Sequence, residues 1–320
     1  MMGSGENCSV AVDGHETCTE GALLSVIEPT GGALAVPERK LSPLEAITRS
    51  PAFLPGLLLA AGIALIFLPL WPRLFNLWQG EDGYYSHGFL VPAIAGYIVY
   101  RWWPRLQSIP VHAGWLALIP LALVLYTSRI AVANRIEGLM AVCLLGVLLL
   151  SIWLIAGWRW MWALLFPVAY LGFALPLWTG LINNTTNPLQ IVSTKIAYYI
   201  LKLMGFELYQ AEPTVILMGS FELNVAVPCS GLKLVLALTA FTVFFMLIAN
   251  LKWWGNVIMA AMILPLALLI NGLRIAMIGV VGEKYGDSAG YQFHDYSGYI
   301  TLIVCFFILF KLARFLGWKD

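Results

Sequence analysis

The sequence has few charged side chains. Only 11% of its 320 residues are Asp, Glu, Lys or Arg, whereas about 25% is usual for a soluble domain. The 18 basic and 17 acidic residues nearly cancel, and no run of Lys and Arg occurs, so we expect no nucleic-acid partner. The five cysteines form no Cys-x-x-Cys pair, which argues against a thiol redox centre and a thiolate metal site. No ligand pair has the spacing of a helical metal site either, so we expect no metal and no cofactor.

Hydrophobic residues make up 60% of the chain and gather in long runs. Runs of about 18–25 apolar residues are long enough to cross a hydrocarbon core of about 30 Å. We therefore predict an all-α polytopic membrane protein, with the lipid bilayer as its surroundings. About eight transmembrane helices are expected, at residues 52–71, 86–103, 113–129, 137–157, 160–178, 231–250, 256–281 and 298–316.

The two ends of the chain differ in composition. Residues 1–50 are rich in Gly, Ser, Thr, Glu and Pro and contain no aromatic residue, which predicts a disordered tail. Residues 51–320 form the predicted transmembrane domain. If the N-terminus is cytoplasmic, the inside segments hold ten basic residues and the short outside loops hold four, so we predict that both termini are cytoplasmic.

One predicted loop, at about residues 179–230, is long and lies outside in this topology. Its first half has apolar residues at helical spacing and predicts an amphipathic helix on the membrane surface. Its second half has β-branched residues around Gly219 and Ser220, which predicts a short β-hairpin whose second strand leads to Cys229. Alternatively, the loop only packs over the helix bundle. No internal repeat is visible, so a transporter built from two inverted halves is not favoured.

Several polar residues stand within or beside the predicted spans. Asn271 and Arg274 are three positions apart in the seventh span and so share a helix face. An arginine within a membrane costs about 2.5–3.5 kcal/mol on insertion scales, so it usually faces a cavity or a partner. Alternatively, Arg274 extends to the outer headgroups. His294, in the loop before the last span, and His87, beside Tyr85 and Ser86, are predicted at the same outer face or simply solvated.

Cys229, Arg274, His294 and His87 thus come from separate spans to one face, and together they provide the groups of a thiol acyl-transfer site. A thiolate is a nucleophile, and a helix N-terminus or a nearby cation stabilises it. Arg274 or amides of the turn at Cys229 could bind the oxyanion, and His294 could move the proton. Ser230 either caps the sixth span or donates to the oxyanion, and Gly231 leaves room for substrate backbone.

Four ordered motifs, "YYSHGFLVP", "VPCSGLK", "NGLRIA" and "FHDYSGY", resemble those of the exosortases, within the exosortase and archaeosortase family. The resemblance covers residue 55 to the C-terminus. It implies that Cys229, Arg274 and His294 are the catalytic residues of a membrane cysteine protease or transpeptidase. It also implies a proton-donor role for the arginine. Since a guanidinium with a pKa above about 12 is a poor proton donor, we expect Arg274 to bind the oxyanion or hold the thiolate.

The resemblance further implies the substrate and the location. Substrates would be exported proteins with a C-terminal signal that consists of a Pro-Glu-Pro motif, a transmembrane helix and a basic tail. Cleavage would leave an acyl-thioester on Cys229, and water or an unknown acceptor would resolve it, in connection with extracellular polysaccharide synthesis. The chain would lie in the bacterial inner membrane with its active site at the outer face. Two alternatives from the residues themselves are a non-enzymatic permease or assembly partner for a polysaccharide, and a lipid-binding scaffold.

Overall fold

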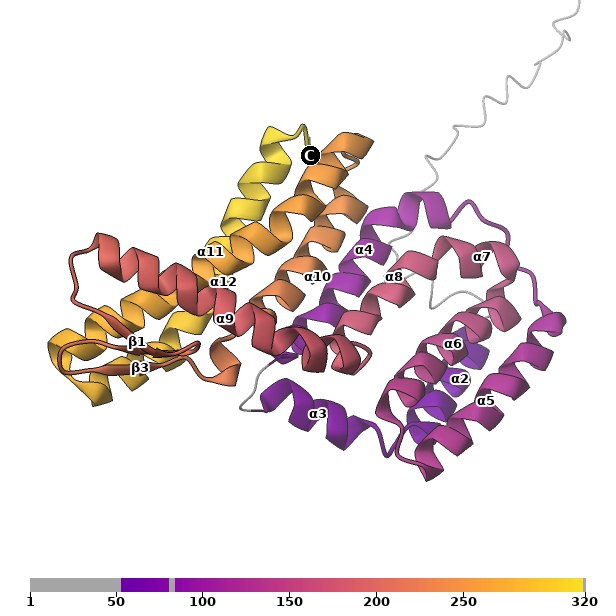
Figure 1. The fold of residues 1–320 in the computed structure, drawn as a ribbon. Coiled ribbons are helices and arrows are strands. Elements are labelled where there is room, and N and C mark those ends of the chain that lie inside the picture. Colours follow the sequence, from indigo (N-terminus) through magenta and orange to yellow (C-terminus); the bar gives the residue numbers. More distant parts are fainter. Residues whose placement is uncertain (1–52, 81–83, 319–320) are drawn as a thin grey trace, which may run out of the picture. The chain divides into compact units, whose positions relative to one another are not determined.

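The computed structural model describes residues 53–80 and 84–318, and the predicted tail over residues 1–50 lies outside them. The described chain is mostly helical and contains a small antiparallel sheet (Figure 1). By length and composition, four helices could each cross a membrane: Trp115–Ala133, Glu137–Ala156, Trp253–Tyr285 and Asp287–Phe315. Two further helix pairs pass the same test together but are bent, by 73° and 57°. The structure thus supports a polytopic membrane protein with four to six spans, and the predicted eight are not confirmed.

The first part of the described chain contains seven helices. They are α2 (Phe53–Ile66), α3 (Trp71–Gln79), α4 (Leu90–Leu106), α5 (Leu118–Ala133), α6 (Glu137–Ala156), α7 (Trp158–Ala163) and α8 (Leu165–Tyr170). Predicted span 52–71 contains α2 and ends at the bend before α3, and predicted span 160–178 is divided into α7, α8 and a 3-10 turn at Leu171–Ala174. Prolines within both segments explain part of this difference, because proline removes a helix hydrogen bond.

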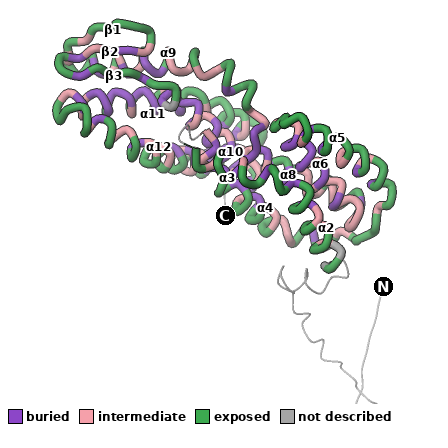
Figure 2. Tube along the Cα trace, turned by 90° about the horizontal axis from the view of Figure 1, so that it is seen from below, coloured by how far each residue is buried: buried purple, intermediate pink, exposed green. Residues whose placement is uncertain are grey.

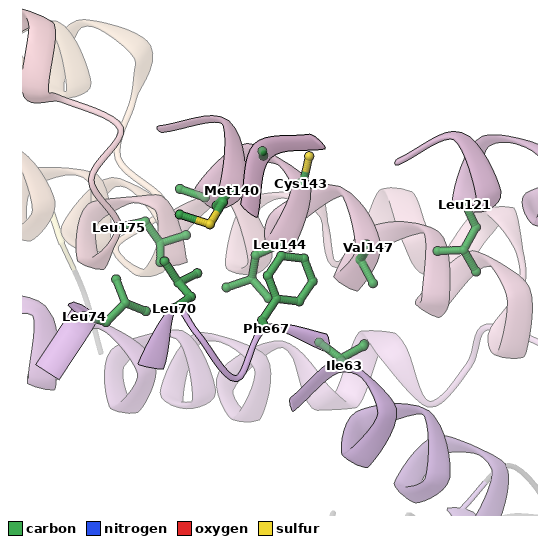
Figure 3. Close-up of a cluster of buried hydrophobic side chains, with 12 residues drawn as sticks. Ile63, Phe67, Leu70, Leu74, Leu121, Met140, Cys143, Leu144, Val147 and Leu175 are labelled. Carbon is green, nitrogen blue, oxygen red and sulfur yellow. The ribbon is translucent and has the colours of Figure 1, made fainter. Parts of the chain in front are cut away.

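A buried hydrophobic cluster holds α2, α3, α5 and α6 together (Figure 3). Phe67, in the turn after α2, is fully buried and belongs to the same cluster as Met140 and Leu144 of α6. Cys143 belongs to this cluster, as expected for a small packing residue. The opposite face of α5 exposes large apolar side chains such as Ile119 and Leu123 (Figure 2), which suits contact with lipid.

The last part of the chain contains three long helices, α10 (Leu232–Ile248), α11 (Trp253–Tyr285) and α12 (Asp287–Phe315). They share a second buried cluster with Phe245, Met259 and Leu309 at its centre, and Cys305 is fully buried there. Helix α11 packs along both α12 and α9. Its side chains therefore lie between these two helices. Helix α4 packs against α10 and connects this part to the first.

The long predicted loop is more ordered than expected. It begins with α9 (Thr179–Leu203), a helix that includes most of the predicted amphipathic segment, residues 187–206, and begins eight residues before it. The predicted hairpin is confirmed as β2 (Val215–Leu217) and β3 (Glu222–Asn224), with an additional strand β1 (Tyr209–Glu212) in the order β1-β2-β3.

The hairpin is fixed to the C-terminal end of α11. The ring of Phe221 lies so close to Gly282 that a Cβ there would be 2.5 Å from it, so only glycine fits. The amide of Ser220 donates to the carboxylate of Glu283 at 3.0 Å. These contacts place β3, and therefore the chain that leads to Cys229, beside α11.

One boundary changes the setting of a candidate residue. The last span was predicted to begin at residue 298, whereas α12 begins at Asp287. His294 therefore lies within a helix and not in a loop, which corrects the prediction. The first turns of α12 are polar, and a hydrophobicity window detects only the part of a helix that contacts hydrocarbon.

Candidate active site

Cys229 lies in a tight turn between β3 and α10. The chain is extended at Ala226, forms the 3-10 helix η4 (Val227–Cys229), and then enters α10. The amide of Cys229 donates to the carbonyl of Ala226 at 2.8 Å, and the amide of Ser230 donates to the carbonyl of Val227 at 3.1 Å. These two amides are therefore already used by the turn.

The thiol of Cys229 contacts an imidazole from another helix. Its Sγ lies 2.7 Å from Nε2 of His294 on α12. On the other side of the ring, Nδ1 lies 3.2 Å from Oδ1 of Asp295. With hydrogen on Nδ1 held by the carboxylate, Nε2 is free to accept the proton of the thiol. The arrangement is that of a nucleophile, a base and an orienting acid.

Arg274 connects α11 to the same part of α12. Its Nε donates to Oγ of Ser297 at 2.9 Å, and its Nη2 donates to the carbonyl of His294 at 2.9 Å. The guanidinium is half-buried and close enough to interact electrostatically with Cys229. It has these polar partners within the protein, which supports the site interpretation over extension to the headgroups.

Asn271 and Gly231 fix the backbone on the other side of the thiol. The Nδ2 of buried Asn271 donates to the carbonyl of Cys229 at 2.8 Å. Gly231 has φ +84°, and a Cβ on it would be 2.9 Å from Nδ2 of Asn271. Glycine is thus required here by conformation and by the close amide of Asn271, whereas the sequence suggested room for substrate.

Ser230 is fully buried beside the thiol. Its Oγ accepts a hydrogen bond of 3.4 Å from the amide of Leu232, and its carbonyl accepts one of 3.2 Å from Ser193 on α9. The N-cap position of α10 is Gly231, so Ser230 does not cap this helix as an N-cap residue; its hydroxyl accepts from the first amide of α10 instead.

The environment of Cys229 acts on its pKa in two directions. Burial raises the pKa of the thiol, and the charge of Arg274 opposes part of this rise. The net pKa lies above its ordinary value. Cys229 is therefore mainly a neutral thiol near pH 7, and its reactivity depends on a base within reach.

Tyr85, beside Ser86 and His87 in the chain, belongs to one buried cluster with Leu232 and Leu236 of α10. Tyr84 Oη donates to the carbonyl of Val227 at 3.5 Å, and Tyr85 Oη accepts from the amide of Trp178 at 3.2 Å. Ser86 is half-buried.

His87, in the 3-10 turn before α4, is buried, and burial lowers its pKa to about 4. It stacks on Tyr85 and interacts electrostatically with Lys233, and among the described residues it has no hydrogen bond to Cys229. This predicted segment therefore packs at the edge of the site and, within the described residues, forms no hydrogen bond with the thiol of Cys229.

Sequence reasoning did not assign roles to Asp295, Ser297 or Lys233. Ser297 could have been predicted as a neighbour of His294, because positions 294 and 297 share a helix face once the segment is helical. Lys233 follows Cys229 by four positions and lies in the first turn of α10. In the described part of the chain, no group of three or more His, Cys, Asp or Glu side chains is placed to hold a metal.

Comparison with known proteins places this site in a family. No curated protein and no solved structure matches the chain. The family model of the transmembrane exosortases matches residues 71–311, a range that includes Cys229, Arg274 and His294. Because this range is most of the sequence, the chain belongs to the transmembrane exosortase family, as its four motifs predicted.

Proposed function

We propose that this protein is a membrane cysteine protease or transpeptidase that cleaves the C-terminal sorting signal of exported proteins. The observation that carries the proposal is the 2.7 Å contact between Sγ of Cys229 and Nε2 of His294, two residues from separate elements. A buried thiol in direct contact with an imidazole is the arrangement that nucleophilic cysteine catalysis needs. Family membership supports the same chemistry.

In the first step His294 acts as the general base. Its Nε2 takes the proton from the thiol as Sγ attacks the carbonyl carbon of the scissile peptide bond. The new S–C bond turns the carbonyl oxygen into an oxyanion. Because the amides of Cys229 and Ser230 are used by the turn, Arg274 is the better oxyanion donor. Within the described residues its Nη1 has no hydrogen-bond partner.

The second step releases the C-terminal fragment. As the C–N bond breaks, His294 returns its proton to the leaving amine, and the substrate stays on Cys229 as a thioester. Water or the amine of an acceptor then attacks the thioester, with His294 again taking the proton. Asp295 holds the imidazole in the orientation that both steps use.

The motifs support a substrate with a Pro-Glu-Pro sequence before a transmembrane helix and a basic tail. Such a signal would bring the scissile bond to the membrane surface, and the excess of basic residues on the predicted inner side supports a position of Cys229 at the outer face. We therefore propose exported proteins as substrates, in connection with extracellular polysaccharide systems.

The test is processing of an exported reporter that carries this signal. Cells that express the wild-type chain should release the reporter without its C-terminal segment, and Cys229→Ala or Cys229→Ser should abolish this release. Cys305→Ala is the matched control, because Cys305 is equally buried but lies in a hydrophobic cluster. Normal processing by a folded, membrane-inserted Cys229→Ala protein would contradict the proposal and favour the permease alternative.

A further inference from the structure

A second cation, Lys233, lies at the start of α10, four residues after Cys229. Lys233, in the first turn of α10, is half-buried and interacts electrostatically with Arg274 and with His87. The ion pairs formed within the described residues are Arg73–Glu137 and His294–Asp295, so no carboxylate pairs with Lys233 there. Two like charges share a partly dehydrated site.

This arrangement is costly without a negative charge. Like charges that are withdrawn from water repel more strongly, and each also loses hydration. Asp295 interacts with Arg274, but its carboxylate is 79% exposed and contacts His294. His87 adds no negative charge, and its buried Nδ1 has no hydrogen-bond partner within the described residues. The start of α10 adds further positive potential. Among the described residues, the component that this part of the site lacks is an anion.

The available donors match a carboxylate. Arg274 already uses Nε for Ser297 and one N–H of Nη2 for the carbonyl of His294, and the proposed mechanism uses Nη1 for the oxyanion, so the second N–H of Nη2 remains for another anion. Lys233 supplies a single ammonium group. Together they can bind the two oxygens of one monoanionic group. In the first turn of α10, four residues after Cys229, Lys233 can reach a substrate side chain near the scissile bond.

We propose that Lys233, with Arg274, forms an anion subsite that binds an acidic side chain of the peptide substrate next to the bond that Cys229 attacks. This inference rests on the proposed function, in which the signal contains a glutamate between two prolines. Lys233 is then a specificity-determining residue of the reaction.

The first experiment is a double-mutant cycle between enzyme and substrate. Cleavage rates at low substrate concentration are compared for reporter signals with Glu or Gln, with wild type and Lys233→Gln. We expect wild type to prefer Glu by about tenfold or more, the effect of one hydrogen bond to a charged group. Lys233→Gln should reduce this preference to near one, and Lys233→Glu should prefer a substrate with Lys in the same position. The matched control is Lys195→Gln, which removes an exposed lysine of α9 and should keep the preference.

An unchanged preference for Glu in Lys233→Gln would overturn the proposal. So would a second result, in which Lys233→Gln alters only the response to anionic against zwitterionic lipid in nanodiscs, because the anion would then be a lipid phosphate.

A binding measurement separates this inference from the proposed function. A fluorescent signal peptide is bound to purified Cys229→Ala protein, which cannot turn over, and the ratio of Kd for Gln and Glu peptides is measured with and without Lys233→Gln. A ratio that depends on Lys233 supports the subsite even if no cleavage is ever seen. A ratio that does not depend on Lys233 contradicts the subsite even if cleavage is normal.

Discussion

Cys143 and Cys229 lie in two regions of the molecule and are almost equally buried, with exposures of 3% and 4%. Around Cys143, the side chains of α2, α3, α5 and α6 are hydrophobic (Figure 3). Around Cys229, a turn and two helices bring His294, Arg274 and Asn271 to the thiol and its carbonyl. Burial alone therefore does not distinguish a packing cysteine from a candidate nucleophile, whereas the polar partners do.

The two regions also differ in the hydrogen bonding of their polar side chains. Beside the Cys143 cluster lies an apolar cavity of about 720 Å³, and the buried hydroxyl of Ser151 on its wall has no hydrogen-bond partner among the described residues. In the Cys229 region, Asn271 and Arg274 are hydrogen-bonded to backbone carbonyls. A connected polar network in a low-dielectric setting fixes one geometry. The site is thus the region where exact placement matters for function.

The largest expected effect is on catalysis. His294→Ala should lower the rate of reporter processing by about 100- to 10,000-fold, the usual contribution of a general base. The melting temperature of the purified protein should change little, because the ring is partly exposed and its removal opens no apolar cavity. Rates and melting curves are measured on the same preparation. A large fall in stability with the same loss of activity would assign His294 to structure instead.

The reverse pattern is expected in the Cys143 region. Phe67→Ala removes a fully buried ring from the first cluster and should lower the free energy of unfolding by about 3 kcal/mol. Processing per folded molecule should stay close to wild type, because Phe67 belongs to a different cluster from Cys229. Unfolding in detergent measures the first effect and active-site titration the second. A selective loss of activity in the stable fraction would show that the two regions are coupled.

A smaller effect concerns the pH dependence of the thiol. Since burial raises the pKa of Cys229, alkylation by iodoacetamide should increase as pH rises and level off above the ordinary thiol pKa. Arg274→Gln removes the opposing charge, so its curve should shift to higher pH with the same plateau. The protein used has Cys8 and Cys18 of the tail replaced by Ser, and labelling is followed by peptide mass spectrometry.

Cys143 provides the internal control in that experiment. It is buried among hydrophobic side chains and should react slowly throughout the pH range. Identical curves for Cys229 in wild type and Arg274→Gln would show that the guanidinium does not act on the thiol.

The sequence predicted the helical membrane class, the hairpin at Gly219 and the three residues that meet at the site. It did so because long apolar runs report contact with lipid, and because turn residues and motifs are local signals. It missed the helix around His294 because the first turns of α12 are polar, and it missed the bend after α2, where proline interrupts the apolar run. The partners Ser297 and Lys233 were missed for a different reason: their roles exist only after α10, α11 and α12 are side by side.

The smallest expected effect tests how far the site extends toward solvent. Asp295→Asn removes a carboxylate that is 79% exposed, and an exposed ion pair contributes at most about 1 kcal/mol. Processing should therefore fall by less than about fivefold, because the asparagine oxygen can still accept from Nδ1 of His294. Asp295→Leu, which cannot accept, should reduce the rate further. If Asp295→Asn were as inactive as His294→Ala, the negative charge itself would be essential. The catalytic unit would then be a triad of Cys229, His294 and Asp295, which extends from the buried thiol to the aqueous surface.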